Sequence, residues 1–593
     1  MKKHFTLFFV ISSLFCRAQL SVQNDAYIYV NDTFIFVEDD VNLDDVNSTL
    51  YLRNEGQLLQ GNGVTGNTGN GELSVYQQGT VNKWTYNFWC SPIGQANGSN
   101  TNGDFNITQL KQPFSNLVSN DFNFVSSDDG NNLTNPIEIS NRWIYTYQQS
   151  AEYGDWNYVG NINDIIPGLG FTMKGTSGNP VVGQTVDFRG KPNNGLIING
   201  VRDTEFTLVG NPYPSAMDAA AFIHHPLNVT IINGVLYYWE QRTDIESHVL
   251  SNYIGGYAEY TIDATGTVET FVPAVFFTYD ANGDPLPLPP PGEFGSKTAK
   301  RYIPIGQGFM VEGSAPFGFV RTTNDMRVFE KESSGNSYFF RNNNNSEQTN
   351  EIVYNEYGLN IVPDDFKRFR LNVDFSVSGN DYTRQLLMNF HDSATTNFDY
   401  GLEVKRSENL STDAYWNQDD IPYSVQALQF NEDLIIPITL QIEEVQPVKI
   451  RLFDAQNFVE NQPIYVFDTE NSSYTNLRQT DFTTTLNAGI YSDRFKIVFK
   501  TDGALSLDDH VINTVDIFQD NFKSILEINN PKLFTINSIE LFDVLGRSVF
   551  SVSKSSAEHS YSFSTANLNN GVYVVKISTN DHGEYSQKIV VSN

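Results

Sequence analysis

Few residues in this chain have the types and spacings that catalysis needs. The sequence holds eight histidines but no His-Glu-x-x-His pair and no Gly-x-Ser-x-Gly turn. His224 and His225 are adjacent and would not share a helix face, which favours a solvated loop pair over a zinc site. Cys90 lacks the surroundings of a thiol nucleophile, so we expect a small buried hydrophobic residue there. A carboxylate pair for glycoside hydrolysis stays open, because 69 acidic residues offer many pairs and their separation is set in three dimensions.

Two acidic loops could hold calcium. Asp280-Ala-Asn-Gly-Asp284 resembles the start of an EF-hand loop, but Pro285 and Pro291 stand where that loop needs Gly and Glu. An EF-hand is therefore excluded. A looser calcium site in this loop, or at Ser127-Asp-Asp-Gly130, remains a hypothesis, and the sequence indicates no other cofactor.

Aromatic residues are the remaining candidates for ligand contacts. The chain holds 30 Tyr, 43 Phe and 6 Trp, and exposed Tyr or Trp beside Asp or Asn could stack on sugar rings. Packing inside strands is the commoner use of such residues. The pattern Gly-x-Gly-Phe-x-x-x-Gly occurs at 168–175 and 306–313. A dinucleotide loop would need a third glycine that opens a helix, and β-type sequence follows instead, so both segments are predicted to be turns between strands.

The net charge limits the possible partners, and the N-terminal residues indicate export. The net charge of −32 disfavours nucleic acid and anionic lipid as partners. Lys2 and Lys3 precede an apolar run that ends before Cys16-Arg-Ala18, which predicts a signal peptide cleaved after Ala18. Cleavage would remove three cations and no acid, leaving a charge of −35 and Cys90 as the one thiol, so no internal disulfide is expected. No later apolar run is long enough to form a transmembrane helix.

Short apolar runs predict β-strands along the whole chain. From Gln19 to Gly79 they are bounded by Asn, Asp or Gly, which favours stacked rungs of a β-solenoid or a meander cap. The two Gly-x-Gly-Phe segments each follow an aromatic strand, which suggests a weak internal duplication. The clearest helix signal is residues 214–223, with Ser215 as the predicted N-cap. Residues 351–500 alternate as in a larger β-sandwich.

The C-terminal stretch combines several strand and turn signals. Ile539 to Arg547 forms a strand and a turn, Gly571 to Ile577 alternates apolar residues, and Gln587 to Asn593 does so again. Turn clusters at 546–547, 569–571 and 580–583 hold residues that tolerate positive φ. Several short strands in about eighty residues suggest a small β-sandwich.

This stretch closely resembles the C-terminal sorting domain of proteins that Bacteroidota export by the type IX secretion system. Phe518-Gln-Asp-Asn521 departs from the Tyr-Pro-Asn-Pro-like beginning of many members, so the start of the domain is less well marked than its end. The resemblance implies that the secretion machinery is a partner and that the protein reaches the medium or the outer cell surface through the periplasm. The residues that match the family motif are Asp543, Gly546, Arg547, Gly571, Tyr573 and Lys588.

The centre of the chain resembles a family of large flavobacterial secreted proteins. Six blocks occur in the family order between about Trp84 and Lys500, among them Trp84 to Gly94, Phe206 to Asp218 and Asn324 to Arg327. The family has no established activity, so the resemblance implies no catalytic residues.

Together these signals predict an all-β fold, with several β-sandwich or β-solenoid-like modules in tandem before a small Ig-like β-sandwich. We interpret the chain as a secreted or cell-surface, non-enzymatic protein with an adhesin-like or matrix- or glycan-binding role. A polysaccharide-degrading enzyme and a structural envelope or biofilm component are the alternatives. The expected segments are a signal peptide at 1–18, a short-strand region at 19–80, β-modules at 81–200 and 201–345, a β-sandwich at 346–500, a linker at 501–514 and the sorting domain at 515–593.

Overall fold

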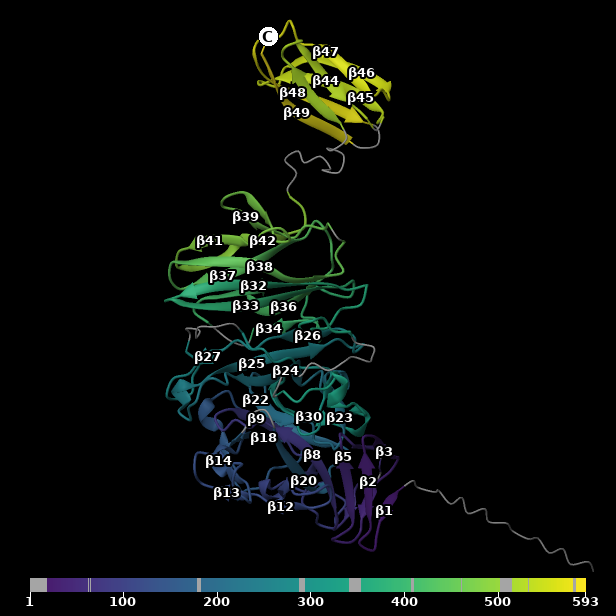
Figure 1. Cartoon of the computed structure of the whole chain (residues 1–593), viewed down its shortest axis with the longest axis vertical. Helices are drawn as coiled ribbons and strands as arrows, with labels where there is room; N and C mark the ends of the chain where they lie inside the picture. The colour runs from purple at the N-terminus through teal and green to yellow at the C-terminus, as the bar shows by residue number, and fades with distance from the viewer. Residues whose placement is uncertain are drawn as a thin grey trace, which may run out of the picture. The chain divides into compact units, whose positions relative to one another are not determined.

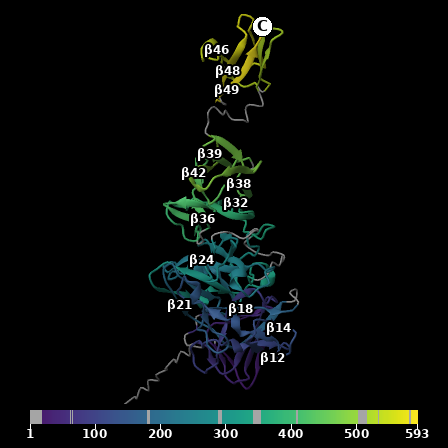
Figure 2. The same ribbon diagram turned by 90° about the vertical axis from the view of Figure 1, so that its left-hand side faces the viewer.

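The chain folds into two compact units, one up to Lys500 and one from Thr501 (Figures 1 and 2). The predicted signal peptide and most of the predicted linker lie outside the residues that the structure describes. No helix in the described ranges is long and apolar enough to cross a membrane. The computed structural model describes residues 19–61, 63, 66–178, 183–286, 294–340, 353–406, 410–459, 461–501, 515–531, 533–579 and 583–592.

The first unit begins with stacked rungs of parallel strands (Figure 1). The pairs Leu20↔Val41, Tyr27↔Thr49 and Phe34↔Gln57 give rung offsets of 21, 22 and 23 residues. The stacked-rung form of the prediction is therefore confirmed. The offset lengthens to 26 residues at Asn42↔Thr68, which explains why the sequence shows no fixed period. The rungs are β1 (Leu20–Val22), β2 (Tyr27–Asn31) and β3 (Phe34–Val37); β4 (Val41–Leu43), β5 (Thr49–Arg53) and β6 (Gln57–Gln60); and β7 (Thr68–Gly69) with β8 (Glu72–Gly79).

Alternating side chains build the interior of these rungs. Leu50 lies between Ile28 and Leu73 on its neighbouring strands. Val30, Leu52 and Val75 form the next buried row. Each fully buried Val or Leu contributes about 1.5–3 kcal/mol relative to an exposed one. Burial of these rows holds the rungs together in a chain region that has no disulfide.

The third rung continues into an antiparallel sheet. β8 pairs with β20 (Gln184–Pro192), from Gly79↔Gln184 to Leu73↔Gly190. The sheet order is β12-β11-β20-β8-β5-β2, so the expected division at residues 80/81 falls inside one sheet. One apolar core accordingly includes residues from Val22 to Phe188. The added strands are β10 (Ile93–Gly94), β11 (Leu110–Pro113) and β12 (Ser119–Asp121).

Two similar strand pairs lie side by side in the middle of this unit. β9 (Tyr86–Cys90) pairs with β18 (Gly170–Lys174), and β22 (Phe206–Gly210) pairs with β29 (Gly308–Gly313). The bridges Trp89↔Gln307 and Leu169↔Val209 join the pairs in matching positions. Gly168 and Gly306, which precede β18 and β29, have φ of +79° and +80°, as turns occupied by glycine allow. The two Gly-x-Gly-Phe segments thus occupy equivalent places, as an internal duplication predicts.

The duplicated pairs approach each other too closely for side chains at their glycines. A Cβ added to Gly210 would lie 2.4 Å from the Cβ of Cys90. Cys90 is fully buried at this contact, and burial raises the pKa of its thiol. The expected small buried hydrophobic role of this cysteine matches that position.

The remaining sheets of this region extend the two pairs. β16 and β17 extend β18, and β24, β25, β26 and β27 extend β29. The bounds of these and the smaller sheets are β13 (Asn123–Val125), β14 (Gly130–Asn131), β15 (Glu138–Ser140), β16 (Tyr145–Thr146), β17 (Asn157–Tyr158), β19 (Thr176–Ser177), β21 (Ile197–Val201), β23 (Ala216–Asp218), β24 (Ile232–Gln241), β25 (Ile254–Ile262), β26 (Glu269–Val272), β27 (Phe277–Thr278), β28 (Tyr302–Ile303), β30 (Gly318–Thr322) and β31 (Arg327–Val328).

The predicted helix is shorter than expected and begins later. α1 covers Ala219–Ile223, and Asp218 is its N-cap, accepting a hydrogen bond from the Ala220 N–H at 3.0 Å. The prediction of Ser215 as N-cap was wrong, because Ser215 directly precedes β23 and is fully buried. Short 3-10 helices are η1 (Ile107–Gln109), η2 (Asn141–Trp143), η3 (Tyr153–Asp155), η4 (Leu250–Asn252), η5 (Asn324–Met326) and η6 (Glu332–Ser334).

The last part of the first unit is one long antiparallel-rich sheet that curls back on itself. Its order is β40-β39-β42-β37-β35-β36-β33-β32-β38-β41, with β34 beside β36. Phe482 of β41 and Phe495 of β42 lie 5.6 Å apart between ring centroids, although their strands are distant in that order. Trp416 and Phe369 fill the enclosed core. The bounds are β32 (Lys367–Val377), β33 (Asn380–Phe390), β34 (Val404–Lys405), β35 (Asp413–Gln418), β36 (Ile421–Leu428), β37 (Ile435–Ile442), β38 (Gln446–Gln456), β39 (Tyr465–Asp468), β40 (Ser473–Asn476), β41 (Phe482–Leu486) and β42 (Gly489–Val498).

The second unit is the predicted small β-sandwich. One sheet has the order β43-β44-β47 and the other β46-β45-β48-β49. Leu526 from the first sheet, with Ile539 and Val575 from the second, belongs to their shared core. The strands are β43 (Asp516–Asp520), β44 (Ile525–Asn529), β45 (Ile536–Asp543), β46 (Ser548–Ser556), β47 (Ser560–Ser564), β48 (Gly571–Thr579) and β49 (Gly583–Val591).

A buried ion cluster yields a stability prediction for the first unit. Asp413 is fully buried and accepts hydrogen bonds from Arg384 at 2.7 and 2.8 Å and from Arg406 at 3.0 Å. Asp413→Ala would leave two desolvated cations without their carboxylate, so we expect a loss of about 3–5 kcal/mol. The denaturant midpoint and hydrogen exchange in β33 and β35 measure it. The exposed Asp493→Ala serves as control, and equal midpoints for both variants would contradict the prediction.

Candidate functional site

The outer face of the six-strand path β12-β11-β20-β8-β5-β2 gathers polar and aromatic side chains from distant parts of the chain. Because side chains alternate along a strand, Tyr29, Tyr51 and Ser74 lie in one row across β2, β5 and β8. Arg189 of β20 continues this row beside Ser74. We call this surface the platform face.

Two tyrosines at the edge of the platform face are open to solvent. Tyr27 is 58% exposed and Tyr29 is 38% exposed. Their ring centroids lie 5.8 and 6.5 Å from that of Tyr51, which is itself nearly buried. Polar pairs flank them: Asn47 donates to Asp25 at 3.2 Å, and Asn54 donates to Asn31 at 2.7 Å. We call Tyr27, Tyr29 and these four flanking residues the tyrosine ledge.

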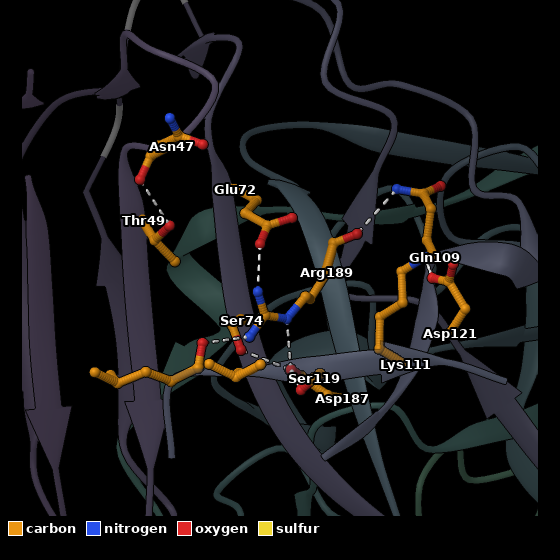
Figure 3. A network of polar contacts seen from close by, with 12 residues as sticks. Asn47, Thr49, Glu72, Ser74, Gln109, Lys111, Ser119, Asp121, Asp187 and Arg189 are labelled. Atoms are coloured by element: carbon orange, nitrogen blue, oxygen red, sulfur yellow. Dashed lines mark hydrogen bonds and ion pairs between the residues drawn. The ribbon is translucent and has the colours of Figure 1, made fainter. Parts of the chain in front are cut away.

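A buried charge network fixes the platform face behind the ledge (Figure 3). The Asp187 carboxylate accepts hydrogen bonds from Ser74 Oγ at 2.7 Å, Ser119 Oγ at 2.6 Å and Arg189 Nε at 2.7 Å. Arg189 also pairs with Glu72 at 2.6 Å. Burial alone would lower the pKa of Arg189, but the Asp187 and Glu72 carboxylates raise it above its ordinary value. Asp187 and Glu72 therefore serve as ion-pair partners of Arg189.

Arg53 extends the network toward the ledge. Its guanidinium donates to Ser74 Oγ at 2.7 Å and lies over the rings of Tyr76 and Tyr51, 3.7 and 5.1 Å from their centroids. Burial lowers the pKa of Arg53, and the Asp187 carboxylate offsets part of that shift. Cation–π contacts of this kind hold the tyrosine rings in fixed orientations.

The loop between β11 and β12 lies over the network. Tyr76 Oη donates to the Ser115 carbonyl at 2.7 Å, Arg53 Nε to that of Asn116 at 2.8 Å, and Arg189 to that of Leu117 at 3.0 Å. Phe114 at the start of this loop is 76% exposed. The arrangement offers a surface of aromatic rings and amide groups held by hydrogen bonds.

Neither predicted calcium loop brings a cluster of metal-ligating side chains together in the described structure. Within the described residues no group of three or more His, Cys, Asp or Glu side chains is placed to hold a metal ion. Asp280 Oδ1 accepts from the backbone N–H groups of Asn282 and Asp284, so it closes its own turn. In the other loop Asp129 bonds to Lys83 and His248. Calcium binding at either loop remains a prediction.

A second cluster joins strand β18 to the loop before β25. Lys174 Nζ lies 3.0 Å from His248 Nδ1 and 2.6 Å from Tyr253 Oη, and it faces the rings of Tyr86 and Trp143 at 4.7 and 4.1 Å. Burial lowers the pKa of Lys174 to about 7, although the Asp128 and Asp129 carboxylates oppose that shift. The side chain is buried, so it acts as an internal link between β18 and the loop before β25.

His248 occupies the centre of this cluster. Its ring lies 4.5 Å from that of Trp84 and 4.9 Å from that of Trp143, and its Nε2 lies 2.8 Å from Asp129 Oδ1. The Asp129 carboxylate at Nε2 can only accept, so the proton of this contact is on Nε2, while Lys174 lies at Nδ1. Burial lowers the pKa of His248; Asp129 acts against that shift and Lys174 adds to it.

Three of the sorting-domain residues, Asp543, Gly546 and Arg547, form a turn at one end of a sheet in the second unit. Asp543 Oδ1 accepts from the N–H groups of Leu545 and Arg547, and Arg547 Nε donates to Asp543 Oδ2 at 2.8 Å. Gly546 has φ of +76°, so a glycine suits this turn. Asp543 pairs with Tyr573 on the next strand. The turn thereby presents Val544 and Leu545 to solvent.

The other motif residues have different surroundings. Tyr573 is buried and its Oη donates to the Asn569 carbonyl at 2.9 Å, while Lys588 is exposed on β49 opposite Val574. Gly571 does not have positive φ, and a Cβ there would meet its nearest atoms at 3.9 Å. The strand itself therefore does not require glycine at 571.

Asn521, a residue without a predicted role, ties the start of this unit to its last strand. Its Nδ2 donates to the Val590 carbonyl at 3.1 Å, and its Oδ1 accepts from the Ser592 N–H at 3.0 Å. Gln587 completes the link by donating to the Ile517 carbonyl at 2.9 Å. The local sequence carried no signal for these contacts, because the partners are about seventy residues apart.

Comparison with known families identifies both parts of the chain. The secretion system C-terminal sorting domain matches residues 522–592. The protein is thus an all-β cargo of the type IX secretion system, which delivers it out of the cell. The chain belongs to the family described as "Domain of unknown function (DUF8693)", which matches residues 95–499. A search of the curated proteins finds no match.

Solved structures with some likeness to the chain are remote. An immunoglobulin-like β-sandwich protein of the DUF3244 family from Bacteroides vulgatus is 21% identical, covering 15% of this chain and 95% of its own, with a TM-score of 0.13. Tp47, the 47-kilodalton lipoprotein of Treponema pallidum, is 9% identical, and the match covers 64% of this chain and 92% of Tp47, with a TM-score of 0.12. The BSP domain of a biofilm associated protein is 10% identical, and the match covers 88% of this chain and 96% of that domain, with a TM-score of 0.12. At these TM-scores none of them informs the function.

The Lys174 cluster predicts a pH-dependent stability. Unfolded lysine binds its proton below a pKa near 10.5, whereas folded Lys174 does so only below about 7. Stability must therefore fall as pH drops from about 10.5 to 7, and the lowered pKa of His248 adds a further loss below about 6.5. One pKa unit is worth about 1.4 kcal/mol, so Lys174→Met should remove about 2 kcal/mol of the rise in stability between pH 7 and 9.

Denaturant midpoints across this pH range measure the effect. Lys111→Met is the matched control, because Lys111 is a partly exposed lysine paired with Asp121 on the platform face. Parallel pH profiles for the wild type and Lys174→Met would contradict the assignment.

Proposed function

We propose that the protein is a non-enzymatic, adhesin-like binder of neutral glycans, and that the tyrosine ledge is its binding surface. The observation that carries the proposal is the pair of exposed, pre-oriented tyrosines Tyr27 and Tyr29, held against Tyr51 at a sheet edge. Rigid aromatic rings contact ligands at a small cost in conformational entropy. The amides of Asn31, Asn47 and Asn54 lie at both ends of the tyrosine ledge and supply hydrogen-bond partners for sugar hydroxyls.

Charge favours neutral over acidic polysaccharides. Asp25 lies in the ledge, and the chain as a whole carries −32. Sulfated or uronic acid chains would be repelled by this field. Arg189 on the platform face does not offset this charge, since it is paired with Asp187 and Glu72.

Export by the type IX system supplies the setting for this role. The sorting domain addresses the protein to the medium or the outer surface, where polysaccharides of other cells and of matrices are accessible. Attachment at the cell surface would make the ledge an adhesive site, and release would make it a matrix component. The proposal includes a cleaved signal peptide at 1–18 as the first export step.

Glycan binding is tested with the purified chain on a glycan array and in hydrolysis assays on the same polysaccharides. The double variant Tyr27→Ala/Tyr29→Ala should weaken binding about tenfold or more, since tenfold corresponds to 1.4 kcal/mol. Phe317→Ala/Phe319→Ala is the matched control, because these rings are 58% and 37% exposed elsewhere on the first unit. Binding that both double variants reduce equally would contradict the ledge.

Other outcomes separate the alternative functions. Release of sugar products would overturn the non-enzymatic proposal in favour of a polysaccharide-degrading enzyme. No binding and no product from any glycan would favour a structural envelope or biofilm component.

Export through the second unit makes a separate prediction. Deletion of residues 515–593 should leave the protein in the periplasm, because the part that matches the sorting domain is lost. Immunoblots of periplasm, surface and medium measure this, with the full chain as reference. Protease resistance of the retained first unit controls for folding. Unchanged delivery of the deleted form to the surface would disprove the assignment.

A further inference from the structure

One end of the β-solenoid in the first unit is an open rung (Figure 1). β1, β2 and β3 each stand at the end of their sheet, so each has one edge that no described strand covers. At the opposite end of the solenoid, β8 is covered because it pairs with β20. In the sheet of β2, β5 and β8, the solenoid is therefore open only at β2 among the described strands.

One edge of strand β2 is not paired with another described strand. The backbone N–H and C=O groups at this edge are those of the residues whose side chains face outward. The Ala26 carbonyl and the Asp32 N–H bond to β5. Because backbone groups alternate along a strand, those of Tyr27, Tyr29 and Asn31 point to the uncovered side. Within the described residues no hydrogen bond to these backbone groups is found.

Natural proteins usually protect such an edge with charges, proline or a bulge. The strand β2 reads Tyr-Ile-Tyr-Val-Asn and contains none of these. Neighbouring β1 and β3 read Leu-Ser-Val and Phe-Ile-Phe-Val, again without charge or proline. The open rung is thus suited to pairing with another strand.

The sequence of β2 is complementary to itself in one antiparallel register. With Tyr29 opposite Tyr29 of a second copy, Tyr27 meets Asn31 and Ile28 meets Val30. Outward side chains then oppose outward ones, and the inward residues Ile28 and Val30 extend the buried rows of both copies. Tyr27, Tyr29 and Asn31 would each donate one hydrogen bond and accept one, as an antiparallel ladder requires.

Charges flanking the strand also permit this register. Asp25 would lie opposite Thr33 of the second copy, and Asp32 opposite Ala26, so no carboxylate faces another. Asp32 is in addition paired with Lys331 at 2.7 Å. The local surface therefore lacks the repulsion that the net charge of −32 would otherwise impose.

We propose that two copies of this protein associate through antiparallel pairing of β2 with β2 about a two-fold axis at Tyr29. The pairing joins two tyrosine ledges into one strip across both copies. Association of the two copies uses the backbone edge of β2 and does not depend on glycan binding. Dimer formation and glycan binding can therefore fail independently of each other.

A cysteine placed on the axis tests the register directly. With Tyr29 opposite Tyr29 in a hydrogen-bonded pair, the two Cα atoms would lie about 5.5 Å apart, within the range of a disulfide. Tyr29→Cys in the full chain should form a covalent dimer under mild oxidation, whereas Tyr27→Cys should not, since residue 27 faces Asn31. Of the two cysteines in the sequence, Cys16 is replaced by serine in both variants, and Cys90 is buried and does not compete. Equal cross-linking of both variants, or none with Tyr29→Cys, would overturn the proposal.

Charge exchange at the same position gives an independent test. Sedimentation equilibrium should show a concentration-dependent dimer for the wild type and monomers for Tyr29→Lys and Tyr29→Glu alone. An equal mixture of these two variants should restore the dimer, because lysine then faces glutamate; restoration also shows that both variants fold. Phe317→Lys, a control at another exposed ring, should leave the dimer intact. A monomeric wild type, a mixture that stays monomeric, or dissociation by Phe317→Lys would each refute the pairing.

Discussion

The antiparallel ladder between β8 and β20 is the interaction on which the first unit depends. It runs from Gly79↔Gln184 to Leu73↔Gly190 and connects a parallel solenoid to an antiparallel module. Without it the third rung would end in a second open edge, and the core from Val22 to Phe188 would be divided. The same ladder places Arg189 beside Ser74 and Asp187 beside Tyr76, so the charge network of the platform face follows from strand register.

Local sequence patterns predicted much of the fold, because apolar and polar residues alternate along a half-buried strand. The runs around Tyr27 and Leu50, the glycine turns at Gly168 and Gly306, and the strands of the sorting domain are all visible in this way. Which strands pair is a different matter. Arg189 and Glu72 are 117 residues apart, and Asn521 reaches Val590 across 69, so no local pattern could connect them. The misplaced N-cap of α1 arose because Ser215 is a good cap by type, while tertiary packing ends β23 at Asp218.

The candidate site was the least predictable part. The sequence showed abundant tyrosine but not which tyrosines are exposed. Tyr51 is buried because β5 has a neighbouring strand on both sides, whereas Tyr27 is exposed because β2 has a neighbour on one side only. The sorting motif was easier, since Asp543, Gly546 and Arg547 interact within five residues of chain. Motifs that stabilise their own turn can be found in sequence, and surfaces assembled from distant strands cannot.

The buried position of Cys90 has a consequence for transit through the periplasm. That compartment is oxidising, and a single accessible thiol there invites mixed disulfides with other proteins. In the folded chain the sulfur is sealed between the two duplicated strand pairs, and burial keeps it in the unreactive thiol form. An unfolded chain would expose it. Completion of the contact between Cys90 and Gly210 thus removes this thiol from solvent.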